Sequence, residues 1–459
     1  MFNEILDKFV YLRYMENETS VNVGDTKINV NKLAGNFVAL GSVLGLGLNV
    51  LGGETNYLIG KIQMIIESGC SEFFNFKDMV WADKEYGKLL LAGISDLNSE
   101  NSKSLLTLLM NHFNVTNDLK DKIAKKHYSK DMLSRLFNNI SLLFMYEAGE
   151  HALHAQTMLA ILHRNKCLSP TGEKVSLFEA FDVNVIGNNG ELIIKSGYKT
   201  LTGEDLTLDT SFLLKIEKQM KYCNNTMHGS LGYDDKGLIH RRIWGKFIMN
   251  FRQWMIGHYT RRFGERKHNF ELGEDREGYY WTCAKFLFNI VMDTYNNKGK
   301  IIAAFKENKE NLNEMEIANI KRALVETALL ISAYVTSMLL GAPDKTNRGK
   351  WLRRHLQYLN GRLLMELEAS TPLSGVKFGG SLMTQLNSPF AAMSTMSKIF
   401  NLFRFGLLFE EVQTGKYAGE NMYWHKNKKA IPFYQQLHTL YNLAEDEYAF
   451  TLFNKSEYK

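Results

Sequence analysis

The pattern of apolar and polar positions along this 459-residue chain is mainly that of α-helices. Between Ile239 and Trp254 the apolar residues recur at spacings of four, four, four and three, which places them on one face of a helix. The chain has only five prolines and the first is Pro170, so the preceding residues are free to form long helices. Further helices are predicted over residues 32–52, 57–68, 77–97, 102–113, 118–126, 131–163, 212–222, 279–296, 314–340, 350–368 and 389–413.

Two short stretches break the helical pattern. Residues 20–30 alternate small polar and branched side chains around Gly24-Asp25, which is typical of a β-hairpin. Residues 165–210 are rich in turn-forming residues, and the sequence GELIIKSGYKTLTGEDLTL predicts two strands joined near Ser196-Gly197. We therefore predict a mainly α fold, a multi-helix assembly with two small β-hairpin elements.

The chain is long for a single hydrophobic core, so more than one packed unit is expected. Changes in composition predict four parts. These are an N-terminal helical unit with the early hairpin (1–164), a β insertion that acts as a joint (165–211), a central helical unit with a basic and aromatic helix (212–345), and a C-terminal helical unit with an extended tail (346–459).

Two apolar stretches have a composition close to that of membrane spans. Residues 37–51 are rich in glycine and shorter than the ~20 residues that a bilayer requires. Residues 323–340 are longer but contain Glu326, which is costly to place in lipid. We interpret both stretches as buried helices of a soluble protein. Insertion into a membrane is the alternative.

The overall composition excludes few functions. A net charge of +6 permits contact with nucleic acid or an anionic membrane surface and requires neither. The four cysteines are far apart in the sequence, which argues against a zinc site or a disulfide scaffold and fits a reducing compartment. The N-terminal residues lack the order of a signal peptide, and none is predicted.

The best candidate for a metal site is the sequence YEAGEHALHAQ. Glu147 and His151 are four residues apart, as are Glu150 and His154, so that adjacent helix faces would converge on one ion. Neither the HExxH order of metalloproteases nor a second ExxH copy is present. We therefore interpret these residues as pairs that stabilise a helix, and predict no metal, no cofactor and no catalytic residue. A metal-dependent enzyme that uses this helix is the alternative.

The most unusual part of the sequence is a basic and aromatic block around residues 228–280. In the simplest interpretation, its basic side chains lie on the solvent-exposed face of a packed helix. A subunit interface and contact with a nucleic-acid backbone are the alternatives, because arginines and large aromatic residues are enriched in both. For nucleic-acid binding, the arginines would form one exposed stripe. The residues predicted to bind nucleic acid or a partner protein are Arg241, Arg242, Arg252, Trp254, Arg261 and Arg262.

Segments along nearly the whole chain resemble one known group of proteins. They include LGLNVLGGETNYLIGKIQ, AGEHALHAQTMLAIL, VSLFEAF, HGSLGYDDKGLIHRRIWGKF, EGYYW and TGKYAGENMYW. They are similar to segments of large virion-associated, polyvalent-type proteins of tailed bacteriophages, notably the crAss-like phages of gut Bacteroidales. This chain resembles their helical C-terminal module. Those proteins are far longer fused chains, so that a separately encoded or processed piece is expected here.

The resemblance implies a location rather than a reaction. It predicts a non-enzymatic virion protein, synthesised in the host cytoplasm and carried in the neck, the tail or the interior of the particle. Such a protein acts through protein–protein contacts. The expected partners are other virion proteins, including a ring of identical copies, with phage DNA and the host membrane during ejection as further partners. The alternative function is an ejected nucleic-acid-binding or membrane-active protein that assists genome delivery.

Overall fold

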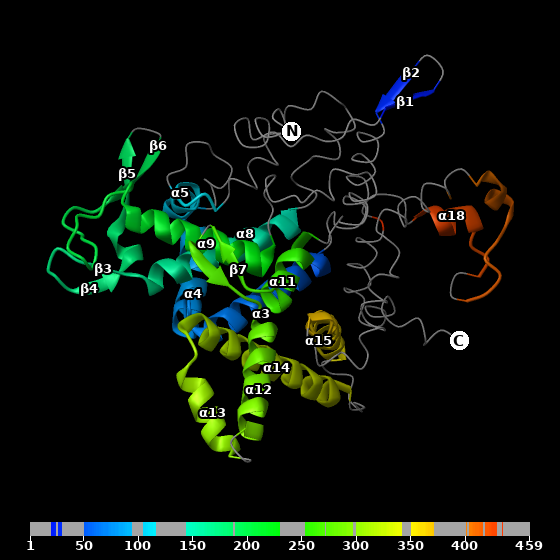
Figure 1. The fold of residues 1–459 in the computed structure, drawn as a ribbon. Helices are drawn as coiled ribbons and strands as arrows, with labels where there is room; N and C mark the ends of the chain where they lie inside the picture. Colours follow the sequence, from blue (N-terminus) through cyan, green and yellow to red (C-terminus); the bar gives the residue numbers. More distant parts are fainter. Residues whose placement is uncertain are drawn as a thin grey trace.

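The computed structural model describes residues 20–23, 26–29, 50–93, 104–115, 144–186, 189–229, 253–270, 272–296, 300–341, 350–370, 401, 404–415, 418–428 and 434. Within these residues the predicted mainly α class is confirmed (Figure 1). The expected hairpin near Gly24 is also confirmed, with β1 (Ser20–Val23) paired antiparallel to β2 (Thr26–Asn29). The small β elements that accompany the helices are four two-stranded hairpins within the described residues, two more than the sequence predicts.

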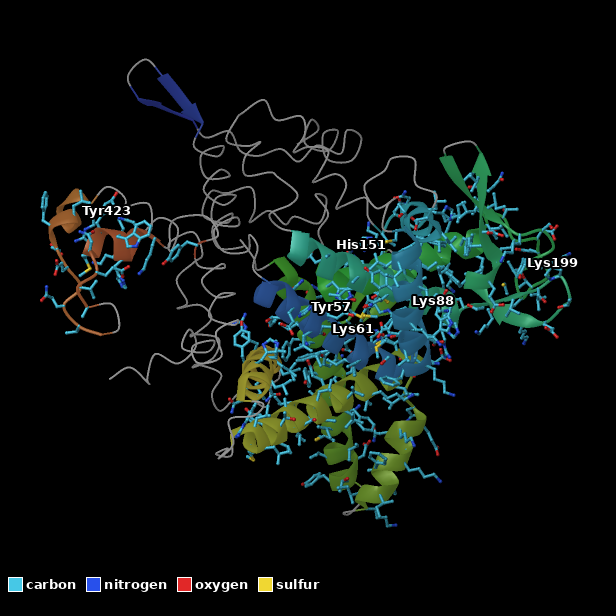
Figure 2. All side chains as sticks on the ribbon, turned by 180° about the vertical axis from the view of Figure 1, so that it is seen from behind. Tyr57, Lys61, Lys88, His151, Lys199 and Tyr423 are labelled. Atoms are coloured by element: carbon cyan, nitrogen blue, oxygen red, sulfur yellow. The ribbon has the colours of Figure 1, made fainter. Side chains whose placement is uncertain are left out.

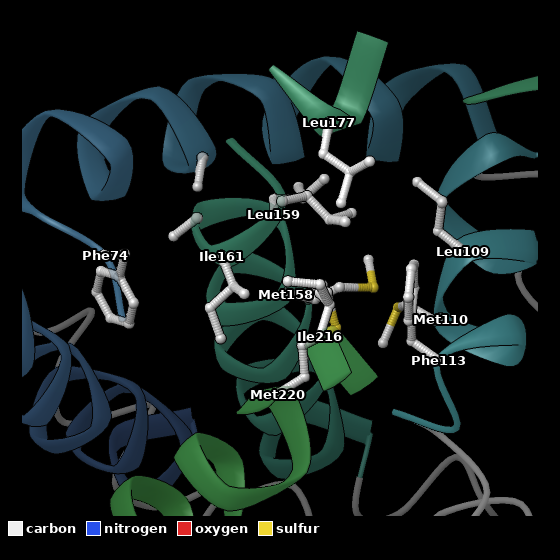
Figure 3. Packing of buried hydrophobic residues seen from close by; sticks show 14 of the residues in the cluster. Phe74, Leu109, Met110, Phe113, Met158, Leu159, Ile161, Leu177, Ile216 and Met220 are labelled. Carbon is white, nitrogen blue, oxygen red and sulfur yellow. The ribbon is translucent and has the colours of Figure 1, made fainter. Parts of the chain in front are cut away.

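The largest core surrounds one helix. This helix, α8 (Phe144–Arg164), contacts α3 (Val50–Cys70), α4 (Phe76–Gly93) and α9 (Ser211–His228), and α5 (Leu105–His112) closes one end of the core. Five consecutive residues of α8, from Met158 to Leu162, are fully buried, so the helix is enclosed on every side. Figure 3 shows side chains of α8 in contact with apolar residues from the surrounding elements. This segment is apolar all round because no face of it meets water.

The stretch between α8 and α9 is irregular, as predicted, but its strands pair differently. Four short strands form two antiparallel hairpins, β3 (Lys166–Leu168) with β4 (Lys174–Ser176) and β5 (Phe181–Ile186) with β6 (Asn189–Ile194). A 3-10 helix, η4 (Leu177–Ala180), lies between them. The predicted hairpin around Ser196-Gly197 was therefore wrong. Its first strand exists as β6, but β6 pairs with the preceding strand.

The second half of the chain adds a layer of helices on α3. Its elements are α11 (Gln253–Phe263), β7 (Lys267–Asn269), β8 (Glu274–Arg276), α12 (Tyr279–Asn296), α13 (Ile301–Glu310), α14 (Glu314–Gly341) and α15 (Lys350–Ser370). Local sequence sets the start of α14, because Asn313 accepts a hydrogen bond from the backbone of Glu316 and donates its own backbone N–H to the Glu316 carboxylate. A smaller core joins Ile62 and Ile66 of α3 to α14 and α15. The helix α3 therefore contributes to both cores.

Two short elements lie towards the C-terminus, the 3-10 helix η7 (Phe405–Phe409) and α18 (Met422–Asn427). The predicted α-helix up to Gln413 was wrong from residue 404 onward, since η7 is a 3-10 helix that ends at Phe409. Residues 32–49 of the predicted helix 32–52 and the whole of the predicted helix 118–126 lie outside the described residues, and residues 50–52 belong to α3. The four-part division of the chain stays a prediction.

Candidate functional site

The candidate site forms where the predicted basic block meets α3 and α14. Of the six predicted residues, the structure describes the side chains of Arg261 and Arg262, in the last turn of α11. The expectation that these arginines lie exposed was wrong, since only 6% of the Arg261 side chain and 1% of the Arg262 side chain are exposed. Trp254 lies in α11, but its side chain is outside the description, as are residues Arg241, Arg242 and Arg252.

Glu326, in the middle of α14, is fully buried and binds Arg262. The Arg262 guanidinium donates to Glu326 Oε1 from Nη2 at 2.6 Å and from Nε at 3.1 Å. The other carboxylate oxygen accepts hydrogen bonds from two tyrosines of α12, at 2.5 Å from Tyr279 and 2.8 Å from Tyr280. The carboxylate is thus neutralised and fully hydrogen-bonded, as a buried charge must be.

Glu67, near the end of α3, forms the second centre of the network. Arg322 of α14 donates to both of its oxygens, at 3.0 Å from Nε and 2.5 Å from Nη2, and Arg261 binds the first of these oxygens as well. Burial alone would raise the pKa of Glu67, but the charges of Arg322 and Arg261 outweigh it and lower this pKa to about 2. Glu67 is therefore ionised at every physiological pH.

Two further residues connect these centres to the rest of the fold. The Gln63 side-chain oxygen accepts hydrogen bonds from both Arg261 and Arg262, at 3.3 Å and 3.5 Å. Arg276 of β8 binds Glu72, and Glu72 also binds Arg322. The guanidinium of Arg276 lies 5.3 Å from the ring centres of Phe73 and Tyr222. The result is a buried charge network that joins α3, α11, α12 and α14. We define it by its charged members, Glu67, Glu72, Arg261, Arg262, Arg276, Arg322 and Glu326.

One part of this network has the donor atoms of a metal site. Among the described residues, the one group of three potential ligands close enough for a single ion is Glu67, Cys70 and Glu72. Both carboxylates already bind guanidinium groups. Burial, followed by the charge of Glu67, raises the pKa of the Cys70 thiol to about 12, and the thiol donates to the Glu67 carbonyl. The group is arranged to bind arginine, so these residues do not fit a metal ion.

The histidines of the candidate metal helix have other neighbours. Nδ1 of His151 lies 3.3 Å from the hydroxyl of Tyr86, and the His154 ring lies 5.3 Å from that of His228. Figure 2 shows His151 on α8 near Tyr57 and Lys61 of α3. The side chain of Glu147 lies outside the described residues. In the described part of α8, the candidate residues do not form a group that could hold one ion.

Sequence reasoning missed the acidic half of the network. Glu67 and Arg322 are 255 residues apart in the chain, and no local pattern connects them. The sequence did indicate that Glu326 has a buried cationic partner, because a lone carboxylate inside an apolar helix needs one. It does not identify Arg262 as that cation. The chain matches no protein-family model, no curated protein and no solved structure.

The start of α12 is held against the end of α11 by a close backbone contact at Gly278. Its N–H donates to the Gly264 carbonyl at 2.8 Å, and an added Cβ would lie 2.5 Å from the Gly264 nitrogen and 2.7 Å from the Arg262 carbonyl. Backbone atoms cannot move aside as a flexible side chain can. We expect Gly278→Ala to lower the free energy of unfolding by about 1–3 kcal/mol, measured by chemical denaturation.

Gly87 provides the matched control for this substitution. It lies inside α4, and nothing comes within 4 Å of an added Cβ. Gly87→Ala is therefore expected to raise the free energy of unfolding by about 0.5–1 kcal/mol, since alanine favours helix. Equal effects of the two substitutions would show that the contact between α11 and α12 is not tight.

Proposed function

We propose that this protein is a non-enzymatic component of a tailed-phage virion and acts through contacts with other virion proteins. The observation that carries the proposal is that the segments which resemble phage virion proteins meet in one core. LNVLGGETNYLIGKIQ leads into and forms most of α3, AGEHALHAQTMLAIL lies in α8, and VSLFEAF runs from β4 through η4 to β5. The helices α3 and α8 pack directly on each other.

These segments supply residues that hold the fold together. Gly60 of α3 lies against Leu153 of α8, and Leu177 of VSLFEAF is fully buried in the same core. EGYYW contributes Tyr279 and Tyr280, both of which bind Glu326. A likeness in core positions supports a shared fold more strongly than a likeness on the surface, because core residues must fit one another.

The burial of Arg261 and Arg262 weighs against the nucleic-acid alternative. Phosphate contact requires accessible cations, and these two are already neutralised by Glu326 and Glu67. The enzymatic alternative lacks support in the network, where the three carboxylates of Glu67, Glu72 and Glu326 are bound by guanidinium groups. Contact with partner proteins is the remaining role that this arrangement favours.

Quantitative mass spectrometry of purified phage particles tests the proposal. A symmetric neck or tail component should be present at a fixed ring number, on the order of six or twelve copies per particle. A variable number that falls after infection would identify the protein as delivered cargo, also within the proposal. Its presence in infected cells together with its absence from purified particles would contradict the proposal.

A further inference from the structure

The polarity of α14 is the reverse of that of a surface helix in a soluble protein. Such a helix turns its apolar face to the core and its charges to water. In α14 the charged residues Arg322 and Glu326 point inward and are buried in the charge network. The opposite face carries an exposed stripe at helical spacing: Ile317, Leu324, Ile331, Val335 and Met338.

The neighbouring helix α12 has the same arrangement. Its inward residues Tyr279 and Thr282 are buried and hydrogen-bonded to Glu326 and Asn319 of α14. Its outward side carries large apolar side chains, with Phe288 63% exposed and Tyr295 83% exposed. The outward stripe of α12 consists of Trp281, Phe288, Val291 and Tyr295.

This much exposed apolar surface requires a covering partner. Soluble monomers seldom expose contiguous apolar patches beyond a few hundred Å². In the part of the chain that the structure describes, α14 is the one helix long and apolar enough to cross a membrane, judged by length and composition alone. Only 22% of its most apolar window is buried, whereas a core helix of a soluble protein is mostly buried. The expectation that residues 323–340 form a buried helix was therefore wrong for their outward face.

The distribution of charge on the two helices matches a bilayer surface. Between Leu324 and Gly341 no charged side chain of α14 is exposed, because Glu326 is buried, and this length spans about 25 Å. Lys321 of α14 and Lys285 of α12 are exposed beside the stripes, Lys285 as the partner of the buried Glu277 carboxylate, and Glu314 is exposed in the first turn of α14. Both lysines lie within one turn of the contact between Asn319 and Thr282, so they lie beside the two stripes near the point where the helices meet. An uncharged stripe suits hydrocarbon, and lysines beside it suit phosphate headgroups.

We propose that the outward faces of α12 and α14 bind a lipid bilayer. The apolar stripes enter the hydrocarbon at the membrane surface without crossing it, and Lys285 and Lys321 lie at the phosphate level. The charge network stays in the protein interior, where membrane proteins keep their ionised groups. This inference goes beyond the proposed virion role and rests on the protein surface alone, so either can fail without the other.

Flotation of the purified full-length chain with lipid vesicles tests the inference. We expect binding to vesicles of phosphatidylcholine, and stronger binding when part of the lipid is phosphatidylglycerol. The triple variant Ile331→Gln, Val335→Gln, Met338→Gln should bind at least about tenfold more weakly, because it removes three apolar side chains from the stripe. These residues are exposed, so circular dichroism should show the same helix content as in the parent protein.

The matched control changes three apolar residues that are about equally exposed elsewhere, Val185→Gln, Leu201→Gln and Leu214→Gln. This control should bind vesicles as the parent protein does. No binding to either kind of vesicle, or equal loss in both triple variants, would overturn the inference. Self-association in buffer that the α14 variant abolishes, without vesicle binding, would assign the surface to a second copy and overturn it as well.

Discussion

Replacing Glu326 by glutamine is expected to lower the free energy of unfolding by about 3–5 kcal/mol, because it leaves a buried guanidinium without its counter-ion. Glutamine keeps the shape of the side chain and can still bind Arg262 and the hydroxyls of Tyr279 and Tyr280. Only the negative charge is removed. The Arg262 side chain is only 1% exposed, so water cannot replace the lost counter-ion. Since native proteins are stable by only about 5–15 kcal/mol, chemical denaturation should reveal this loss readily.

Two further variants show whether the lost charge is the cause. Glu310→Gln, at an exposed position at the end of α13, should change the free energy of unfolding by less than about 0.5 kcal/mol. Adding Arg262→Met to Glu326→Gln should recover most of the loss, because replacing both charges of a buried pair is often close to neutral. Additive losses in the double variant would contradict the argument, as would a single variant no less stable than the Glu310 control.

Helices were well predicted where the apolar periodicity extends over many residues and ends at turn-forming residues. The predicted helix 279–296 has the same bounds as α12, and the prediction 314–340 differs from α14 by one residue at its end. Turn chemistry was harder to interpret. The apolar run before Ser196-Gly197 could pair with the strand that precedes it or with the residues that follow the turn. In the structure this run is β6 and pairs with β5, a choice that the local sequence does not determine.

The site was predicted in part and with the wrong exposure. The sequence identified Arg261 and Arg262 as unusual, but a cluster of arginines at a helix end has the same pattern whether it faces water or carboxylates. Their exposure depends on Glu67 and Glu326, which lie 194 and 64 residues away in the chain. The outward face of α14 was missed for a related reason, since an apolar helix has the same composition in a core as on a membrane surface.

Acid is expected to unfold this protein, starting with its buried histidines. His258 of α11 donates a hydrogen bond from Nε2 to the Met227 carbonyl at 2.8 Å. Burial, followed by the charges of Arg262 and Arg261, lowers the pKa of His258 from 6.5 to about 3. Burial also lowers the pKa of His228 well below 6.5, and that of His151 in the same direction. In the folded protein these histidines are therefore neutral.

The direction of the pH dependence follows from these pKa values. Between pH 6.5 and pH 3 the unfolded chain binds a proton at His258 that the folded protein does not bind, so stability falls as pH falls. Above pH 6.5 His258 is neutral in both states and does not change the free energy of unfolding. Between pH 6.5 and pH 3 its titration lowers this free energy, on the order of 5 kcal/mol in all. Glu67 acts in the same direction at lower pH. Its contribution is complete above pH 4.5 and is lost as pH falls through about 2.

Substitution of His258 by glutamine isolates its share of this effect. Glutamine can still donate to the Met227 carbonyl, but it does not titrate. The free energy of unfolding, measured by urea denaturation at several pH values below 6.5, should decrease less steeply in His258→Gln than in the parent protein. The difference in slope should approach one proton, about 1.4 kcal/mol per pH unit. Parallel curves for the two proteins would mean that His258 already binds its proton in the folded state, and that the charges of Arg261 and Arg262 do not reach it.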